Sequence, residues 1–200
     1  MTTNGFGSRP ALAVAYHSGF GHTAALAGAV VAGATTGGAD VEAIAVDAMT
    51  DVDWDVLDGA DAIIFGTPTY GQRVRGLSGL RRADRPTLPE RHVARQGRGG
   101  FTNSGGKSGD KLSTLMSLAV FAAQHHMHWV NLGLVAGWNS STASEQDPNR
   151  LGFFLGAGAQ TNVDASPKEV HPSDARTCEH LGRRVATVTS ELIAGRAAAH

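Results

Sequence analysis

The sequence lacks the features that would place it in several classes of protein. Cys178 is its single cysteine, which excludes an intrachain disulfide framework and a CxxC zinc site. The 17 lysines and arginines face 18 acidic residues, so the basic surplus typical of a duplex-binding protein is absent. No segment approaches the ~18 uninterrupted apolar residues that a membrane helix needs. We therefore expect neither nucleic acid nor a membrane among its partners.

The composition favours a folded chain of one domain. Hydrophobic residues make up 42% of the 200 residues and charged residues 18%, which is unlike a disordered chain. No basic segment followed by an apolar run opens the sequence, so we expect no secretory signal and a cytoplasmic protein. We predict a single domain over residues 1–200.

Short apolar segments alternate with segments of helical periodicity. Strands are predicted at 11–16, 41–46, 60–65, 99–102 and 128–135, and helices at 23–34, 51–58, 110–127 and from an N-cap at Ser173 onward. This alternation predicts βαβ units, and so an α/β fold whose five-stranded parallel sheet carries helices on both faces. Residues 137–170 show weak local signals and are predicted to form a long loop or insertion. Such loops in compact domains are often functional.

The loop after the first predicted strand has the composition of an anion-binding turn. Residues 18–23 read SGFGHT and precede a helix, so backbone N–H groups and the helix dipole favour a bound anion there. The same loop matches the dinucleotide pattern G-x-G-x-x-A through Gly19, Gly21 and Ala24, with Glu42 about twenty residues further on. An NAD-binding Rossmann enzyme is therefore one alternative.

Two further loops follow predicted strands, and ligands of open α/β sheets bind at the carboxyl ends of strands. The sequence TPTYG at 67–71 offers backbone amides and an aromatic side chain, which suits a planar ligand. The sequence TNSGGKSG at 102–109 ends like a P-loop, but Phe101 stands where that pattern requires its first glycine. We reject the P-loop and predict a polar loop rich in N–H groups.

Together the three loops resemble those of the flavodoxin-like FMN-binding fold. More narrowly, they resemble NAD(P)H:quinone oxidoreductases of the tryptophan-repressor-binding-protein (WrbA) type and related NADPH-dependent FMN reductases. The sequence DAIIFGTPT at 61–69 is similar to that family's third strand and loop, and AQHHM at 123–127 resembles its AHHGM segment. The resemblance covers about residues 11–135 and implies a flavodoxin-like sheet of strand order 2-1-3-4-5. His126 departs from it, because the family has glycine there.

The resemblance implies FMN as cofactor, NAD(P)H as electron donor, and a set of site residues. The cofactor-binding residues that it implies are Ser18, Gly19, Phe20, Gly21, His22, Thr23, Thr67, Pro68, Thr69, Tyr70, Gly71, Thr102, Asn103, Ser104, Gly105, Gly106, Ser108 and His125. His125 would also be catalytic, because an imidazole can donate a hydrogen bond to the acceptor or supply a proton. No metal site is expected, since adjacent helical histidines point about 100° apart.

The function implied by the resemblance is electron transfer from NAD(P)H through FMN to a quinone or a similar small acceptor. A homodimer or homotetramer is implied as well. A flavodoxin-type FMN electron carrier is the alternative, although such carriers are usually strongly acidic and this chain has a net charge of −1. The anaerobic response of bound flavin to NAD(P)H separates the two.

Overall fold

The computed structural model describes residues 9–69 and 97–199. The predicted site residues Tyr70 and Gly71 lie outside the described residues. The elements, in chain order, are β1 (Ala11–Tyr16), α1 (His22–Thr36), β2 (Asp40–Ala45), η1 (Val46–Ala48), α2 (Asp51–Gly59), β3 (Ala62–Pro68), β4 (Gly97–Ser104), α4 (Lys111–Gln124), β5 (His128–Trp129), β6 (Ala157–Gln160), η3 (Pro167–Glu169) and α5 (Pro172–Ala198). No helix in the described ranges has the length and apolar character to cross a membrane.

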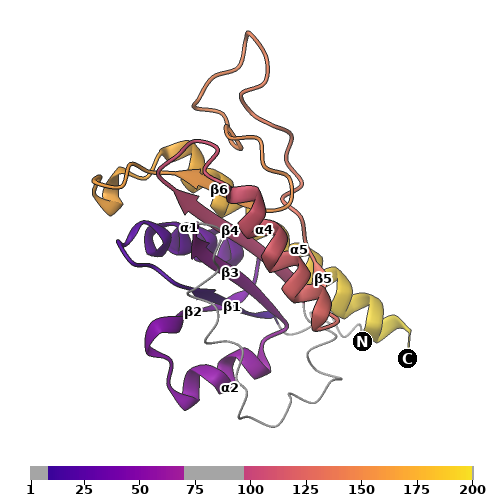
Figure 1. The fold of residues 1–200 in the computed structure, drawn as a ribbon. Coiled ribbons are helices and arrows are strands. Elements are labelled where there is room, and N and C mark those ends of the chain that lie inside the picture. Colours follow the sequence, from indigo (N-terminus) through magenta and orange to yellow (C-terminus); the bar gives the residue numbers. More distant parts are fainter. Residues whose placement is uncertain (1–8, 70–96, 200) are drawn as a thin grey trace.

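The sheet confirms the predicted fold class and strand order. Its strands are parallel and follow the order β2-β1-β3-β4-β5, with β6 as an additional partner of β4 (Figure 1). β3 is the central strand by burial, since all seven of its residues are buried. A strand that is covered on both faces has a continuous run of apolar residues, and such a run in the sequence predicts a buried strand here.

The predicted fifth strand at 128–135 is wrong in its length. β5 contains only two residues, which pair with Gly97 and Arg98, and the chain then leaves the sheet. It returns as β6, which pairs with Phe101–Ser104 further along the same strand. One edge position is therefore shared by two short strands. Residues 130–156 form an excursion between them, and only the middle part of it projects from the body (Figure 1). Gly133, with a φ of 66°, lies at a backbone conformation that a continuing strand does not adopt.

The predicted loop at 137–170 also contains regular structure. β6 and η3 both lie within it, and β6 escaped prediction because its sequence AGAQ carries no β-branched or aromatic residue. The last helix begins at Pro172, one residue before the predicted cap. His171 caps it instead, since its Nδ1 accepts the N–H of Ser173 at 3.2 Å.

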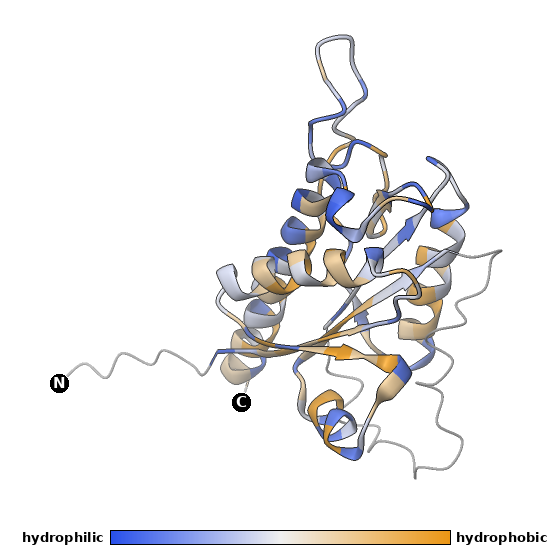
Figure 2. Ribbon diagram, turned by 90° about the vertical axis from the view of Figure 1, so that its left-hand side faces the viewer, coloured by the Kyte–Doolittle hydropathy of each residue, from blue (hydrophilic) through white to orange (hydrophobic). Residues whose placement is uncertain are grey.

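Helices cover both faces of the sheet, as predicted. α1 and α5 pack on one face over Leu12, Val14 and Ile64, and α2 and α4 on the other over Ala13 and Phe65 (Figure 1). The helices carry hydrophobic and hydrophilic residues in alternating bands, as expected for helices that bury one side (Figure 2). Cys178, on α5, is fully buried in the first of these cores.

α1 and α5 approach each other closely at two glycines. A Cβ added to Gly33 would lie 1.8 Å from the carbonyl oxygen of Glu179, and one added to Gly182 would lie 2.0 Å from that of Val30. Both obstacles are backbone atoms, which cannot move without shifting a helix. The helix pair therefore depends on the absence of a side chain at these positions.

We predict that Gly182→Ala destabilises the protein by about 1–3 kcal/mol or more, because overpacking must separate the two helices. Gly28→Ala, on the exposed side of α1 with nothing within 4 Å of the added Cβ, is the matched control. It should stabilise by about 0.4–1 kcal/mol, because alanine restricts the unfolded chain. Urea unfolding followed by circular dichroism measures both, and a stability loss of equal size in the two variants would contradict the close approach.

Candidate functional site

The loops that follow β1, β3, β4 and β6 meet at the carboxyl edge of the sheet. The N–H of His17 donates to the carbonyl of Gly66 at 2.9 Å, and the N–H of Thr69 donates to that of Asn103 at 2.8 Å. On the other side of β4, Ser104 is paired with Gln160. The parallel pairing thus brings together four loops that lie far apart in the sequence.

The loop after β1 has the structure of an anion-binding turn. Gly21 caps α1 with a φ of 86°, and the first turn of α1 contains no acidic side chain. The backbone N–H groups of Gly19, Gly21 and Thr23 have no hydrogen-bond partner among the residues that the structure describes. Ser18 turns inward, since its Oγ accepts the N–H of Ala24 at 3.1 Å. Unpaired N–H groups at a helix N-terminus attract a phosphate or carboxylate.

The structure assigns His22 and Phe20 to different positions in this loop. His22 is 7% exposed, and its Nε2 lies 2.8 Å from the carbonyl oxygen of Ala165, to which it donates. Its ring therefore fastens the loop to the segment after β6, and only its backbone N–H remains for a ligand. The side chain of Thr23 is likewise buried. Phe20, at 65% exposure, lies at the rim.

The threonines of the second and third loops hydrogen-bond to one another. The Thr102 hydroxyl donates to the carbonyl oxygen of Thr67 at 2.6 Å. Since a hydroxyl has one proton, Thr69 must donate to Thr102 at 2.8 Å, and Thr114 of α4 must donate to Thr69 at 2.8 Å. This buried chain fixes the loop after β3 against β4 and α4. The side chains of Thr69 and Thr102 thus have a structural role, and the cofactor contact predicted for these two residues stays a prediction.

The predicted residues Asn103–Gly106 and Ser108 do lie at this edge. The Asn103 side chain is buried and its Oδ1 accepts the Thr161 hydroxyl at 3.2 Å, while Ser104 Oγ donates to the carbonyl of Gly106 at 3.1 Å. Gln160 donates to the carbonyl of Gly105 at 2.9 Å. The side chains therefore shape the loop, which leaves its backbone N–H groups as the ligand donors.

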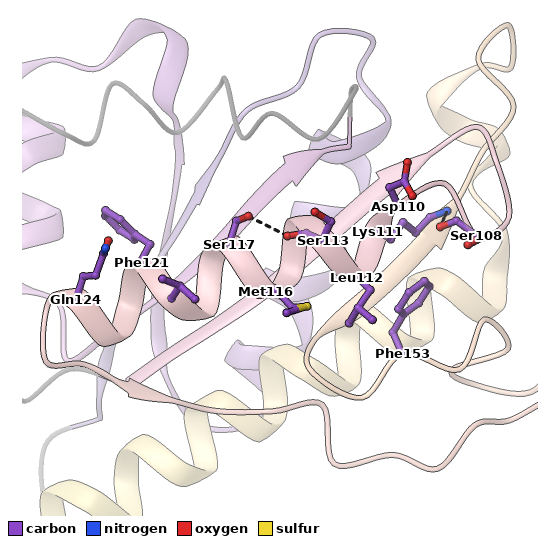
Figure 3. Close-up of a pocket in the computed structure, with 11 residues that line it drawn as sticks. Ser108, Asp110, Lys111, Leu112, Ser113, Met116, Ser117, Phe121, Gln124 and Phe153 are labelled. Atoms are coloured by element: carbon purple, nitrogen blue, oxygen red, sulfur yellow. Dashed lines mark hydrogen bonds between the residues drawn. The ribbon is translucent and has the colours of Figure 1, made fainter.

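Lys111 is the site residue that the sequence analysis missed. It is fully buried at the start of α4 (Figure 3). Its ammonium donates to the carbonyl oxygens of Gly106, Lys107 (3.0 Å) and Ser108 (3.4 Å). Burial lowers the pKa of Lys111 to about 8, although Asp174 opposes the shift. The P-loop comparison drew attention to Lys107, which is exposed, and no motif marks the lysine four residues later.

A buried ion pair lies behind Lys111. Arg150 donates to both carboxylate oxygens of Asp174 at 2.8 Å, and the side chains are 4% and 1% exposed. Asp174 also accepts the N–H of Gln160 at 2.9 Å. The pair joins Arg150, within the 130–156 excursion, to β6 and to the start of α5.

The structure does not bring His125 to these loops. α4 begins beside the loop after β4 and runs back along the sheet for 14 residues, about 21 Å. His125 therefore follows it at the amino edge, near His128, which pairs with the first residue of β4. Its ring packs edge-on against Phe121 with 4.6 Å between centroids. Within one chain, His125 therefore lies away from these loops, because a βαβ crossover returns the chain to the opposite edge, and its flavin contact and catalytic role stay predictions.

A hollow of about 690 Å³ lies along the outer face of α4 rather than over the loops (Figure 3). Leu112, Met116 and Val120 line it and are 50%, 53% and 56% exposed. Ser108 and Asp110 mark the end that reaches the loop after β4.

Comparison with known proteins places the chain in a family. It is 35% identical over 186 residues to Flavodoxin FldP of Pseudomonas aeruginosa (strain UCBPP-PA14). The match covers 90% of this chain and 96% of that protein. A solved structure, the flavodoxin, WrbA-like protein from Agrobacterium tumefaciens, is 35% identical with a TM-score of 0.66, covering 91% of this chain and 98% of that one. The chain belongs to the flavodoxin family.

A more distant structure shows the fold alone. A flavodoxin from the domain Archaea has 19% identity and a TM-score of 0.56, and the match covers 90% of this chain and 99% of that one. No family model matches the sequence. The strand order 2-1-3-4-5 is that of flavodoxins and not the 3-2-1-4-5-6 order of dinucleotide-binding domains, so the Rossmann alternative is excluded.

We predict that Thr102→Val costs about 1–3 kcal/mol of stability, because it leaves the Thr67 carbonyl and the Thr69 hydroxyl without their partner. Ser117→Ala is the control, since the exposed Ser117 hydroxyl bonds only within its own helix, to the Ser113 carbonyl. Its effect should stay within about 0.5 kcal/mol. Chemical unfolding tests this, and equal stabilities of Thr102→Val and the wild type would refute the buried hydroxyl chain.

We also predict that the free energy of unfolding rises as the pH increases from about 8 to 10.5. In this range the unfolded chain still holds the Lys111 proton, whereas the folded protein, with a pKa of about 8, has released it. Lys111→Met should remove this rise, and Lys168→Gln, on exposed η3, should retain it. Urea titrations at several pH values make the comparison, and an identical pH profile in Lys111→Met would contradict the lowered pKa.

Proposed function

We propose that the protein binds FMN at the carboxyl edge of its sheet and carries electrons, as a flavodoxin does. One observation carries the proposal: two loops whose backbone N–H groups lack partners among the described residues meet at this edge, in a chain of the flavodoxin family. The relative from Pseudomonas aeruginosa is named a flavodoxin. When bound, FMN supplies the redox chemistry, and the protein supplies position and electrostatics.

The residues present fit the parts of FMN. The phosphate would be held by backbone N–H groups at the N-terminus of α1, because this end of a helix carries the positive end of its dipole. These groups belong to Gly19, Gly21, His22 and Thr23. The backbone at 67–69 and the loop at 105–109 would border the flavin ring. The buried hydroxyl chain and Lys111 keep these loops in place without offering side chains of their own.

A second candidate is an NAD(P)H-dependent FMN oxidoreductase that acts on a quinone or a similar small acceptor. It is supported by the resemblance of residues 61–69 to the third strand and loop of WrbA-type quinone oxidoreductases. The WrbA-like relative from Agrobacterium tumefaciens supports it as well. The net charge of −1 also favours it, since a carrier is generally steered to its partner by surplus charge. In this candidate the proton for the acceptor would not come from His125 of the same chain, which lies at the other edge.

The homodimer or homotetramer implied by the resemblance stays a prediction. The exposed, uncharged stripe of Leu112, Met116 and Val120 on α4 supports it. Light scattering measures the molar mass, and a value of one chain would contradict it.

The function is tested on protein loaded with FMN and freed of excess by gel filtration. We expect retained flavin absorption at about 450 nm that NADPH or NADH alone does not bleach under argon, and that dithionite does bleach. Bleaching of the flavin by NADPH or NADH alone would contradict the electron-carrier function and favour the NAD(P)H-dependent oxidoreductase. Loss of all flavin during filtration would contradict both.

The same preparation tests the phosphate loop. Gly21→Ala should weaken FMN binding, because the residue has a φ of 86° and its Cβ would lie 2.7 Å from Pro167 Cγ. Riboflavin, which lacks the phosphate, is the matched ligand and should be affected less. An equal loss for both ligands would place the phosphate elsewhere.

A further inference from the structure

Three consecutive carbonyl groups of the loop after β4 converge on one buried cation. The ammonium of Lys111 donates hydrogen bonds to the carbonyl oxygens of Gly106, Lys107 and Ser108, and the side chain has no exposed surface. Gly109 and Asp110, with φ of 53° and 56°, turn the chain into α4 directly afterwards. The loop is thus wrapped around a positive charge that lies beneath it.

The direction of the carbonyls fixes the direction of the neighbouring N–H groups. In a trans peptide the C=O and N–H bonds point in opposite directions, and the described residues contain no cis peptide. The carbonyls of residues 106–108 point to Lys111, so the N–H groups of Lys107, Ser108 and Gly109 point away from it. None of these three has a hydrogen-bond partner among the described residues. They form an outward-facing set of donors for an electron-rich ligand.

The charge of Lys111 is not cancelled by its buried neighbours. Asp174 is already bonded through both oxygens to Arg150, so the cluster of Lys111, Arg150 and Asp174 carries one net positive charge. The charged side chains of the loop, Lys107 and Asp110, are exposed, opposite in sign and screened by water. A buried charge acts on a ligand through a lower effective dielectric than an exposed one.

We propose that Lys111 is a positioning residue that favours reduced FMN over oxidised FMN, by aiming the N–H groups of residues 107–109 at the flavin and by placing a buried positive charge behind them. This inference rests on the proposed FMN function. FMN gains negative charge when it takes up two electrons and one proton, whereas the oxidised ring is neutral. A fixed cation and fixed donors therefore stabilise the reduced form more.

The test compares affinities for the two forms of the cofactor. Apoproteins of the wild type, Lys111→Gln, Lys111→Arg and Lys168→Gln are titrated with oxidised FMN and, under argon, with FMN reduced by dithionite. Lys111→Gln removes the charge and keeps a donor, and it should lower the ratio of oxidised to reduced Kd about tenfold, equivalent to about 30 mV for a two-electron couple. Lys111→Arg and Lys168→Gln should stay within about threefold of the wild type.

An unchanged ratio in Lys111→Gln, or an equal fall in Lys168→Gln, would overturn the inference. Failure of the wild type to bind FMN would instead overturn the proposed function. A second measurement needs no variant: the amide protons of Lys107, Ser108 and Gly109 in the wild type should exchange about tenfold more slowly once FMN is bound. Unchanged exchange at these three amides would overturn the inference even if Lys111→Gln did not fold.

Discussion

The carboxylate of Asp174 is the buried charge on which the carboxyl edge of the sheet depends. It holds Arg150 through two hydrogen bonds and the N–H of Gln160 through a third. Without it, Arg150 and Lys111 would be two buried cations with no counter-charge. Removing one member of a buried pair commonly costs about 3–5 kcal/mol, because the other is left uncompensated. Asp174 also lies in the first turn of α5, where the helix dipole favours a negative charge.

From this carboxylate the remaining contacts follow in sequence. Arg150 lies within the excursion of 130–156, so through Asp174 the ion pair ties this excursion to Gln160 at the end of β6. β6 in turn places Gln160 and Thr161 against Gly105 and Asn103, and Ala165 against His22. The segment after β6 thereby touches both the loop after β1 and the loop after β4. Two loops of the candidate site are held in fixed relation by a segment that has no counterpart among the predicted site residues.

Much of this fold could be predicted because its signals are local. The apolar runs of β1 and β3 and the periodicity of α1, α4 and α5 depend on burial, which the sequence records directly. The excursion could not be predicted in the same way. β5 and β6 are two and four residues long, and they are strands only because Gly97–Ser104 of β4 lies beside them. Pairing of that kind belongs to the tertiary structure.

The candidate site likewise has features with local sequence signals and features that depend on tertiary contacts. Which loops lie at the carboxyl edge could be predicted, since strand ends and glycine-rich turns are visible in the sequence. Which of their side chains are used in internal hydrogen bonds could not, because Thr69 bonds to Thr102 and His22 bonds to Ala165, and these partners lie 33 and 143 residues apart. The position of His125 could not be predicted either, since a motif match does not record that α4 carries the chain to the far edge.

The glycines of β4 explain how a helix with a buried lysine can lie so close to the sheet. A Cβ on Gly99 would lie 2.9 Å from Val185 of α5, and one on Gly100 would lie 3.0 Å from Leu118 of α4. β4 therefore lets helices approach from both faces at its middle. α4 gains the proximity that its first residue, Lys111, needs in order to reach back under residues 106–108. A larger side chain in β4 would lift the helix, and with it the charge, away from the loop. The glycine-rich strand and the buried cation are thus parts of one arrangement, in which close packing of α4 places a positive charge beneath backbone donors.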